Sequence, residues 1–143
     1  MNEEVLNQLL NHGLVRDAEY DACFSVTFLT TPFLAETGAE IELIYDESGE
    51  HVISIVGKEA TCFPNGFDDQ SALVRALWTV NKVNEEEIVE AERVGAWVLN
   101  TQSGNFLYTS SCPKYISLEA LVEFCEAAIQ TYLKTRKHFT NFI

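Results

Sequence analysis

Four cysteines and three histidines are the residues of this chain best suited to chemistry. Thiolates act as nucleophiles or metal ligands, and imidazole acts as a base or a ligand, when the fold brings such groups together. The cysteines form no C-x-x-C pair, and no histidine stands at zinc-ligand spacing from them. A pairing of His51 with Cys62 in space is conceivable, but nothing in the sequence marks either residue as activated. We therefore expect no catalytic residue and no enzyme activity.

The remaining motifs that could hold a metal or a cofactor are equally weak. The seven glycines show neither a G-x-G-x-x-G nor a Walker spacing, which argues against nucleotide binding. Glutamates 85 to 87, 90 and 92 could bind a divalent cation weakly, but a run of one charge is usually a solvated face. We expect no metal and no cofactor. From the neighbouring residues we expect Cys23 and Cys125 in the core, and Cys62 and Cys112 at partly exposed positions.

Acidic side chains dominate the charge of the chain, with 22 acidic residues against 9 basic ones and a formal net charge of −13. Such a body repels nucleic-acid phosphates and anionic membranes, so we expect no direct binding to either. High charge also keeps a protein soluble while it presents apolar surface.

The start of the sequence bears on the location of the protein, and its length bears on the number of domains. The start MNEEVLNQLL lacks the basic-then-apolar order of a signal peptide, and no apolar run approaches 18 residues. Free thiols fit a reducing compartment. We expect a cytoplasmic protein with a single α+β domain over residues 1–143.

Three amphipathic helices are expected to position the apolar residues. The first comprises Val5, Leu6, Leu9 and Leu10 and ends before Gly13. Aspartates 68 and 69 can cap the second, whose apolar stripe comprises Ala72, Leu73, Ala76, Leu77, Val80 and Val83. Ser117 can cap the third, whose stripe comprises Leu118, Leu121, Val122, Cys125, Ile129 and Tyr132.

Five strands are expected between these helices, over residues 22–29, 40–45, 51–56, 88–99 and 106–110. The second and third form a hairpin, and NTQSGN turns the fourth into the fifth. Because three glutamates follow the second helix, we expect that helix to end near Asn84 and a strand to begin near Ile88. The resulting order is α-β-β-β-α-β-β-α, with an antiparallel five-stranded sheet packed with helices. Trp97 and Phe106 are expected in its core, and Trp78, off the main helical stripe, at an interface.

This order of elements in an acidic chain resembles the class I type III secretion chaperones and their relatives, the YbjN-like proteins. The more specific likeness covers residues 72–137. It begins with ALWTVNKVNEEE, in which Asn81 and Asn84 form an N-x-x-N, and continues through the hairpin VGAWVLNTQSGNFLYTS and the helix ISLEALVEFCEAAIQTYL. Residues 1–71 agree in element order only. The chain departs from the family in its basic tail, KTRKH, and in having no recognisable secretion context.

The resemblance implies a homodimeric, non-enzymatic binding module. Secretion chaperones hold an extended segment of a protein client across apolar surface of the sheet and the first helix, whereas YbjN-like members are linked to regulation. Carried over to this chain, the client-side residues would be Val5, Leu9, Leu10, Ile41 and Leu43. The dimer contact would contain Leu77 and Trp78.

Two functions of different classes therefore remain. The first is a protein-binding module, chaperone-like or regulatory, that holds a protein segment on an apolar surface with an acidic rim. The alternative, motivated by the charge alone, is an acidic nucleic-acid mimic or anti-defence inhibitor that occupies a DNA- or RNA-binding protein.

Overall fold

The computed structural model describes residues 17–21, 26–30, 40–46, 51–60, 69–113 and 117–140. Side chains are described for residues 55–59, 69–112, 117 and 119–140. The expected first helix, with Val5, Leu9 and Leu10, lies outside the described residues.

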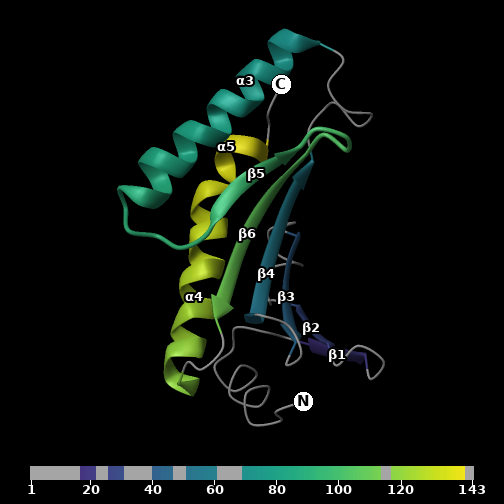
Figure 1. Ribbon diagram of the computed structural model, residues 1–143, viewed down its shortest axis with the longest axis vertical. Coiled ribbons are helices and arrows are strands. Elements are labelled where there is room, and N and C mark those ends of the chain that lie inside the picture. Colours follow the sequence, from purple (N-terminus) through teal and green to yellow (C-terminus); the bar gives the residue numbers. More distant parts are fainter. Residues whose placement is uncertain are drawn as a thin grey trace.

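One antiparallel sheet forms the body of the described structure (Figure 1). Its strands are β1 (Asp17–Asp21), β2 (Val26–Thr30), β3 (Glu40–Asp46), β4 (His51–Ala60), β5 (Ala96–Asn100) and β6 (Asn105–Pro113). They lie in the order β1-β2-β3-β4-β6-β5, so that β5 is an edge strand. The expected β3–β4 and β5–β6 hairpins are confirmed.

The predicted five-stranded sheet is wrong, although the α+β class is correct. The sheet contains six strands. The one that the prediction lacked is β1, whose sequence DAEYD has too few β-branched residues to signal a strand. Helices pack mainly on a three-stranded antiparallel unit, β4-β6-β5, and the described strand side chains belong to these three strands.

The described helices are α3 (Gln70–Lys82), the π-helix η1 (Val83–Val89), α4 (Leu118–Thr135) and α5 (Lys137–Thr140). Both predicted caps are present: the Asp69 side chain accepts a hydrogen bond from Ser71 N, and Ser117 Oγ accepts one from Ala120 N. No helix in the described ranges combines the length and apolar composition needed to cross a bilayer.

The predicted strand over residues 88–99 is wrong in its first half. Instead of ending near Asn84, the helix continues as η1, and β5 begins only at Ala96. Backbone bonds five residues apart run from Glu90 N to Glu85 O and from Arg93 N to Ile88 O. The wider π-helical turn buries both Val83 and Ile88. Apolar and charged residues alternate in VEAERV as they do in a strand, but these residues form the end of a helix and the turn that follows it.

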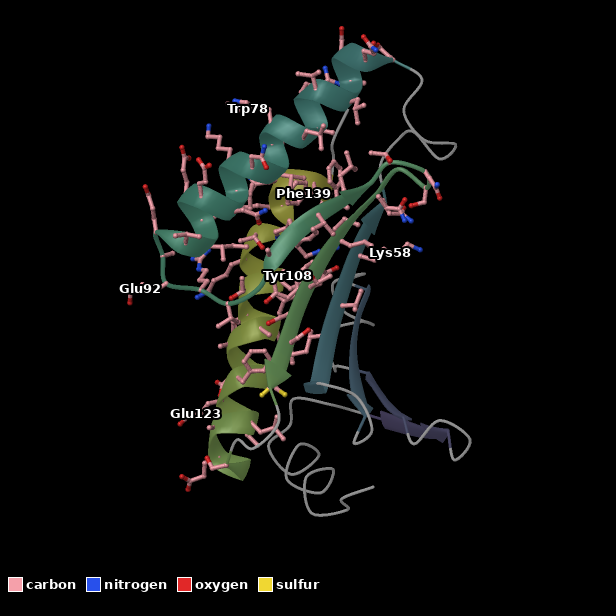
Figure 2. All side chains as sticks on the ribbon, viewed as in Figure 1. Lys58, Trp78, Glu92, Tyr108, Glu123 and Phe139 are labelled. Carbon is pink, nitrogen blue, oxygen red and sulfur yellow. The ribbon has the colours of Figure 1, made fainter. Side chains whose placement is uncertain are left out.

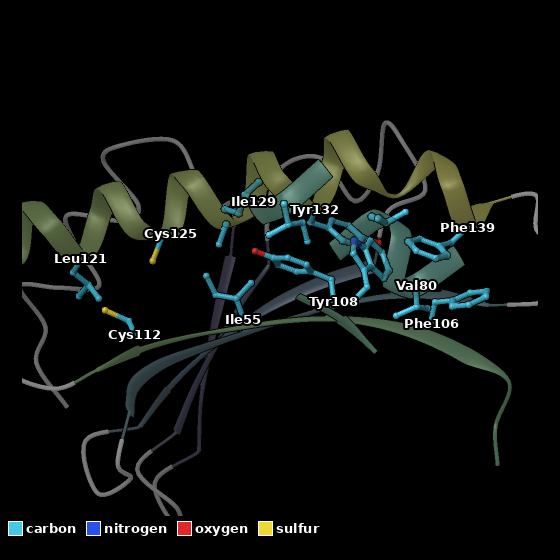
Figure 3. Close-up of a cluster of buried hydrophobic side chains, with 14 of the residues drawn as sticks. Ile55, Val80, Phe106, Tyr108, Cys112, Leu121, Cys125, Ile129, Tyr132 and Phe139 are labelled. Carbon is cyan, nitrogen blue, oxygen red and sulfur yellow. The ribbon is translucent and has the colours of Figure 1, made fainter. Parts of the chain in front are cut away.

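All described helices share one core with β4, β5 and β6 (Figure 3). Its centre is a cluster of five buried rings: Trp97, Phe106, Tyr108, Tyr132 and Phe139. The Trp97 ring lies 4.4 Å from Phe139, 5.7 Å from Tyr132 and 5.8 Å from Tyr108, measured between centroids. The core assignment of Trp97 and Phe106 is confirmed.

A close approach between β4 and α4 sets the spacing of the two layers. A Cβ on Gly57 would overlap Cδ2 and Cε2 of the Tyr132 ring, so only glycine fits there. Beyond the ring, Tyr132 Oη donates to Glu59 Oε1 at 2.9 Å, and Arg136 Nε donates to the same oxygen. The nearly buried Glu59 carboxylate is thereby both hydrogen-bonded and charge-paired.

We predict that Gly57→Ala lowers the free energy of unfolding by about 2–3 kcal/mol, because the added methyl group must displace a packed ring. Urea denaturation measures this change. In a Tyr132→Leu background, where the ring is absent, the same Gly57→Ala change should cost much less. Equal costs in the two backgrounds would show that the Tyr132 ring is not what excludes a side chain at residue 57.

Candidate functional site

The outer side of α3 presents three large apolar side chains to solvent. Val74, Leu77 and Trp78 are 64%, 42% and 60% exposed. Figure 2 shows Trp78 on the side of α3 turned away from the sheet. The opposite side of the helix buries Ala72, Ala76 and Val80. We call Val74, Leu77 and Trp78 the outer stripe of α3; their spacing of three and four residues places them side by side on one helix face.

An open hollow of about 640 Å³ lies along this stripe. It is lined by Gln70, Ser71, Val74, Arg75 and Trp78. At the other end, Lys82 Nζ stands 4.9 Å from the centre of the Trp78 ring, in reach of a cation–π interaction. The stripe is therefore an apolar strip with Arg75 beside it and Lys82 beyond its C-terminal end, and aromatic and arginine side chains are enriched at protein contact surfaces.

The structure places the predicted contact residues in two separate regions. Leu77 and Trp78 lie together in the outer stripe, whereas Ile41 and Leu43 lie in β3, opposite Gly57 and Ile55 of β4. Directly paired residues of antiparallel strands share a face. Ile41 and Leu43 thus occupy positions on the face where α4 lies, one strand beyond β4. The sequence prediction missed Val74, although its spacing to Leu77 and Trp78 could have revealed it.

The described cysteines offer no reactive thiol. Cys112 and Cys125 are free and fully buried, and both point into the gap between β6 and α4 (Figure 3). Burial raises the pKa of Cys112, and burial together with the nearby Cys112 raises that of Cys125 to about 12. The core assignment of Cys125 is confirmed. The partly exposed position expected for Cys112 is wrong, because residue 112 continues the inward-facing series of β6 begun by Phe106 and Tyr108.

Glu87 lies close to Arg93 and His138 where η1 meets α5. Glu87 Oε2 lies 3.6 Å from Arg93 Nη1, and Glu87 Oε1 lies 3.4 Å from His138 Nε2. Arg93 also donates to the Glu87 carbonyl oxygen at 3.2 Å. The described side chains contain no group of three His, Cys, Asp or Glu arranged to hold a metal ion. These contacts connect η1 and the turn after it to the first turn of α5.

No protein-family model and no curated protein matches the sequence. Among solved structures, the chain is similar to one described as an uncharacterized protein from Methanothermobacter thermautotrophicus. The identity is 12%, the match covers 96% of this chain and 97% of that one, and the TM-score is 0.56. At this identity the likeness concerns the fold alone.

We predict that Cys112 and Cys125 react with a disulfide reagent only after unfolding. In a Cys23→Ser/Cys62→Ser background at pH 8, the raised pKa leaves Cys125 about a thousandfold less thiolate in the folded than in the unfolded chain. Thiol release with and without denaturant measures this difference. Because the folded state holds this proton more tightly, its stability should also fall as pH rises from about 9 toward about 12. Rapid labelling of the folded protein at pH 8 would contradict this burial.

Proposed function

We propose that this chain is a non-enzymatic protein-binding module, chaperone-like or regulatory, that works in the cytoplasm. One observation carries the proposal: Val74, Leu77 and Trp78 are exposed side by side on a helix whose opposite face is core. Exposing such a cluster has a cost in solubility, and a partner that covers it would remove this cost. The buried thiols with raised pKa values are in keeping with binding rather than nucleophilic chemistry.

The occupant of the outer stripe is a second copy of this chain, in a homodimer. An antiparallel pairing of α3 with its symmetry mate lays the outer stripe of one copy along the outer stripe of the other. The same pairing places apolar residues against apolar residues. Apolar side chains that meet their own copies about a two-fold axis make the surface self-complementary.

The protein client would then lie elsewhere, on the apolar surface that includes the β3 positions Ile41 and Leu43. Among the described helices, none packs mainly on β1, β2 or β3, so this end of the sheet is separate from the α3 surface (Figure 1). A client there would not compete with the dimer contact. The order α3, β5–β6 hairpin and α4 over residues 70–135 is what supports membership of the YbjN-like and secretion-chaperone group.

We predict that Trp78→Glu weakens self-association on the order of thirtyfold, because a buried charge replaces the largest apolar side chain of the contact. Sedimentation velocity over a concentration series measures this loss. The matched control is Val98→Glu, which adds the same charge at an exposed valine of β5, on the sheet face opposite Trp97. A wild-type protein that remains monomeric throughout the series would refute the homodimer.

The alternative function, an acidic mimic that occupies a nucleic-acid-binding protein, draws on the exposed carboxylates of η1 and the following turn. Glu85, Glu86, Glu90 and Glu92 are all exposed, and Glu92 projects from the turn in Figure 2. A mimic would need these charges to replace phosphates, whereas a binding module would need them only for solubility.

Charge neutralisation separates the two functions. We predict that Glu85→Gln/Glu86→Gln/Glu90→Gln leaves capture of the protein's partners from lysate largely unchanged, as judged by quantitative mass spectrometry. Glu87 is kept, because it contacts Arg93 and His138. If the captured partners are instead basic nucleic-acid-binding proteins that DNA displaces, and the triple variant loses them, the mimic is the correct function.

A further inference from the structure

At one residue of β5, the backbone groups on the outward edge form hydrogen bonds to a side chain, in the way they would to a neighbouring strand. Trp97 N donates to Asn84 Oδ1 at 2.8 Å, and Asn84 Nδ2 donates to Trp97 O at 2.9 Å. A residue of a paired antiparallel strand exchanges the same two bonds with its partner, one accepted and one donated. The carboxamide of Asn84 thus stands in for one peptide group of an absent strand.

The register of the sheet shows that these bonds point away from the sheet. Trp97 faces Tyr108 in the β5–β6 ladder, yet its backbone groups bond to Asn84 and not to β6. Hydrogen-bonded and non-hydrogen-bonded pairs alternate along such a ladder, so Leu99 also turns its N–H and C=O outward. The described residues supply no partner for these two groups of Leu99. Without Asn84, two successive outward positions of β5 would be open.

The π-helix η1 positions Asn84 beside the backbone of Trp97. Asn84 lies in the first turn of η1, and η1 is anchored by the buried side chains of Val83 and Ile88. Asn81, the other asparagine of the N-x-x-N, is exposed. The two asparagines are therefore not equivalent, and only Asn84 meets the strand edge.

We propose that Asn84 is a gatekeeper of the β5 edge, closing it to antiparallel pairing with the β5 edge of a second copy of this chain. An open edge strand is a template for another strand, and two identical edges can pair about a two-fold axis. The exposed glutamates 85 and 86 beside Asn84 add repulsion between copies, since each copy has a net charge of −13. This closure is independent of the α3 contact proposed above.

The test is made in a Trp78→Glu background, in which the α3 contact is removed from every sample. Asn84→Ala should increase the hydrogen-exchange rate of the Trp97 amide by about tenfold or more, because its acceptor is lost. It should also produce dimers or larger species in sedimentation velocity, and more of them as salt screens the repulsion. Asn81→Ala is the matched control and should change neither measurement.

Two further variants keep the outcome decisive. Val98→Lys added to Asn84→Ala places a charge on the β5 edge and should abolish the new species. If Asn84→Ala does not fold, Asn84→Ser replaces it, because its shorter side chain cannot bridge both Trp97 backbone groups. Faster exchange at Trp97 without any larger species at high salt would overturn the gatekeeper role and leave Asn84 as a stabilising residue only. Unchanged exchange would overturn the proposal as a whole.

Discussion

Trp97 is the residue through which the layers of this structure are joined. Its ring contacts Tyr108 of the sheet, Tyr132 of α4 and Phe139 of α5, and its indole N–H donates to Thr135 Oγ1 at 2.8 Å. Its backbone is held from the other side by the Asn84 carboxamide. A buried indole without a hydrogen-bond acceptor would be costly, so α4 must present Thr135 at this level. The position of the helical layer along the sheet follows from that requirement.

The orientation of α3 depends on the same residue. Because η1 is attached to Trp97 through Asn84, the helix that runs into η1 must approach the sheet edge with its small residues inward. Ala72 and Ala76 provide that close approach, and Val80 joins the core cluster. The larger residues Leu77 and Trp78 are left on the outside. The exposed outer stripe is therefore a consequence of how α3 is held and not of a shortage of apolar residues in the core.

Local signals in the sequence predicted much of this structure, and failed where distant contacts decide. The caps at Asp69 and Ser117, the apolar stripe of α4 from Leu121 to Tyr132 and the turn NTQSGN depend on neighbours in the chain, and all are present. The π-helix was missed because its stability comes from burying Val83 and Ile88 against other elements, which no local pattern reveals. The Asn84–Trp97 bonds were missed for the same reason. Leu77 was assigned to the buried stripe as well as to an interface, and only the interhelical geometry could decide between them.

The similarity in fold gives no information on the function of this chain. The similarity to the archaeal protein extends over nearly the whole length of both chains, yet it carries no chemistry from one to the other. The argument for binding comes instead from the apolar side chains that one helix exposes to solvent. A body with 22 acidic and 9 basic residues could cover α3 with charge, but the solvent side of this helix has exposed Val74, Leu77 and Trp78. These exposed apolar residues, on a chain rich in carboxylates, are the observation from which the proposed contact with a second copy is argued.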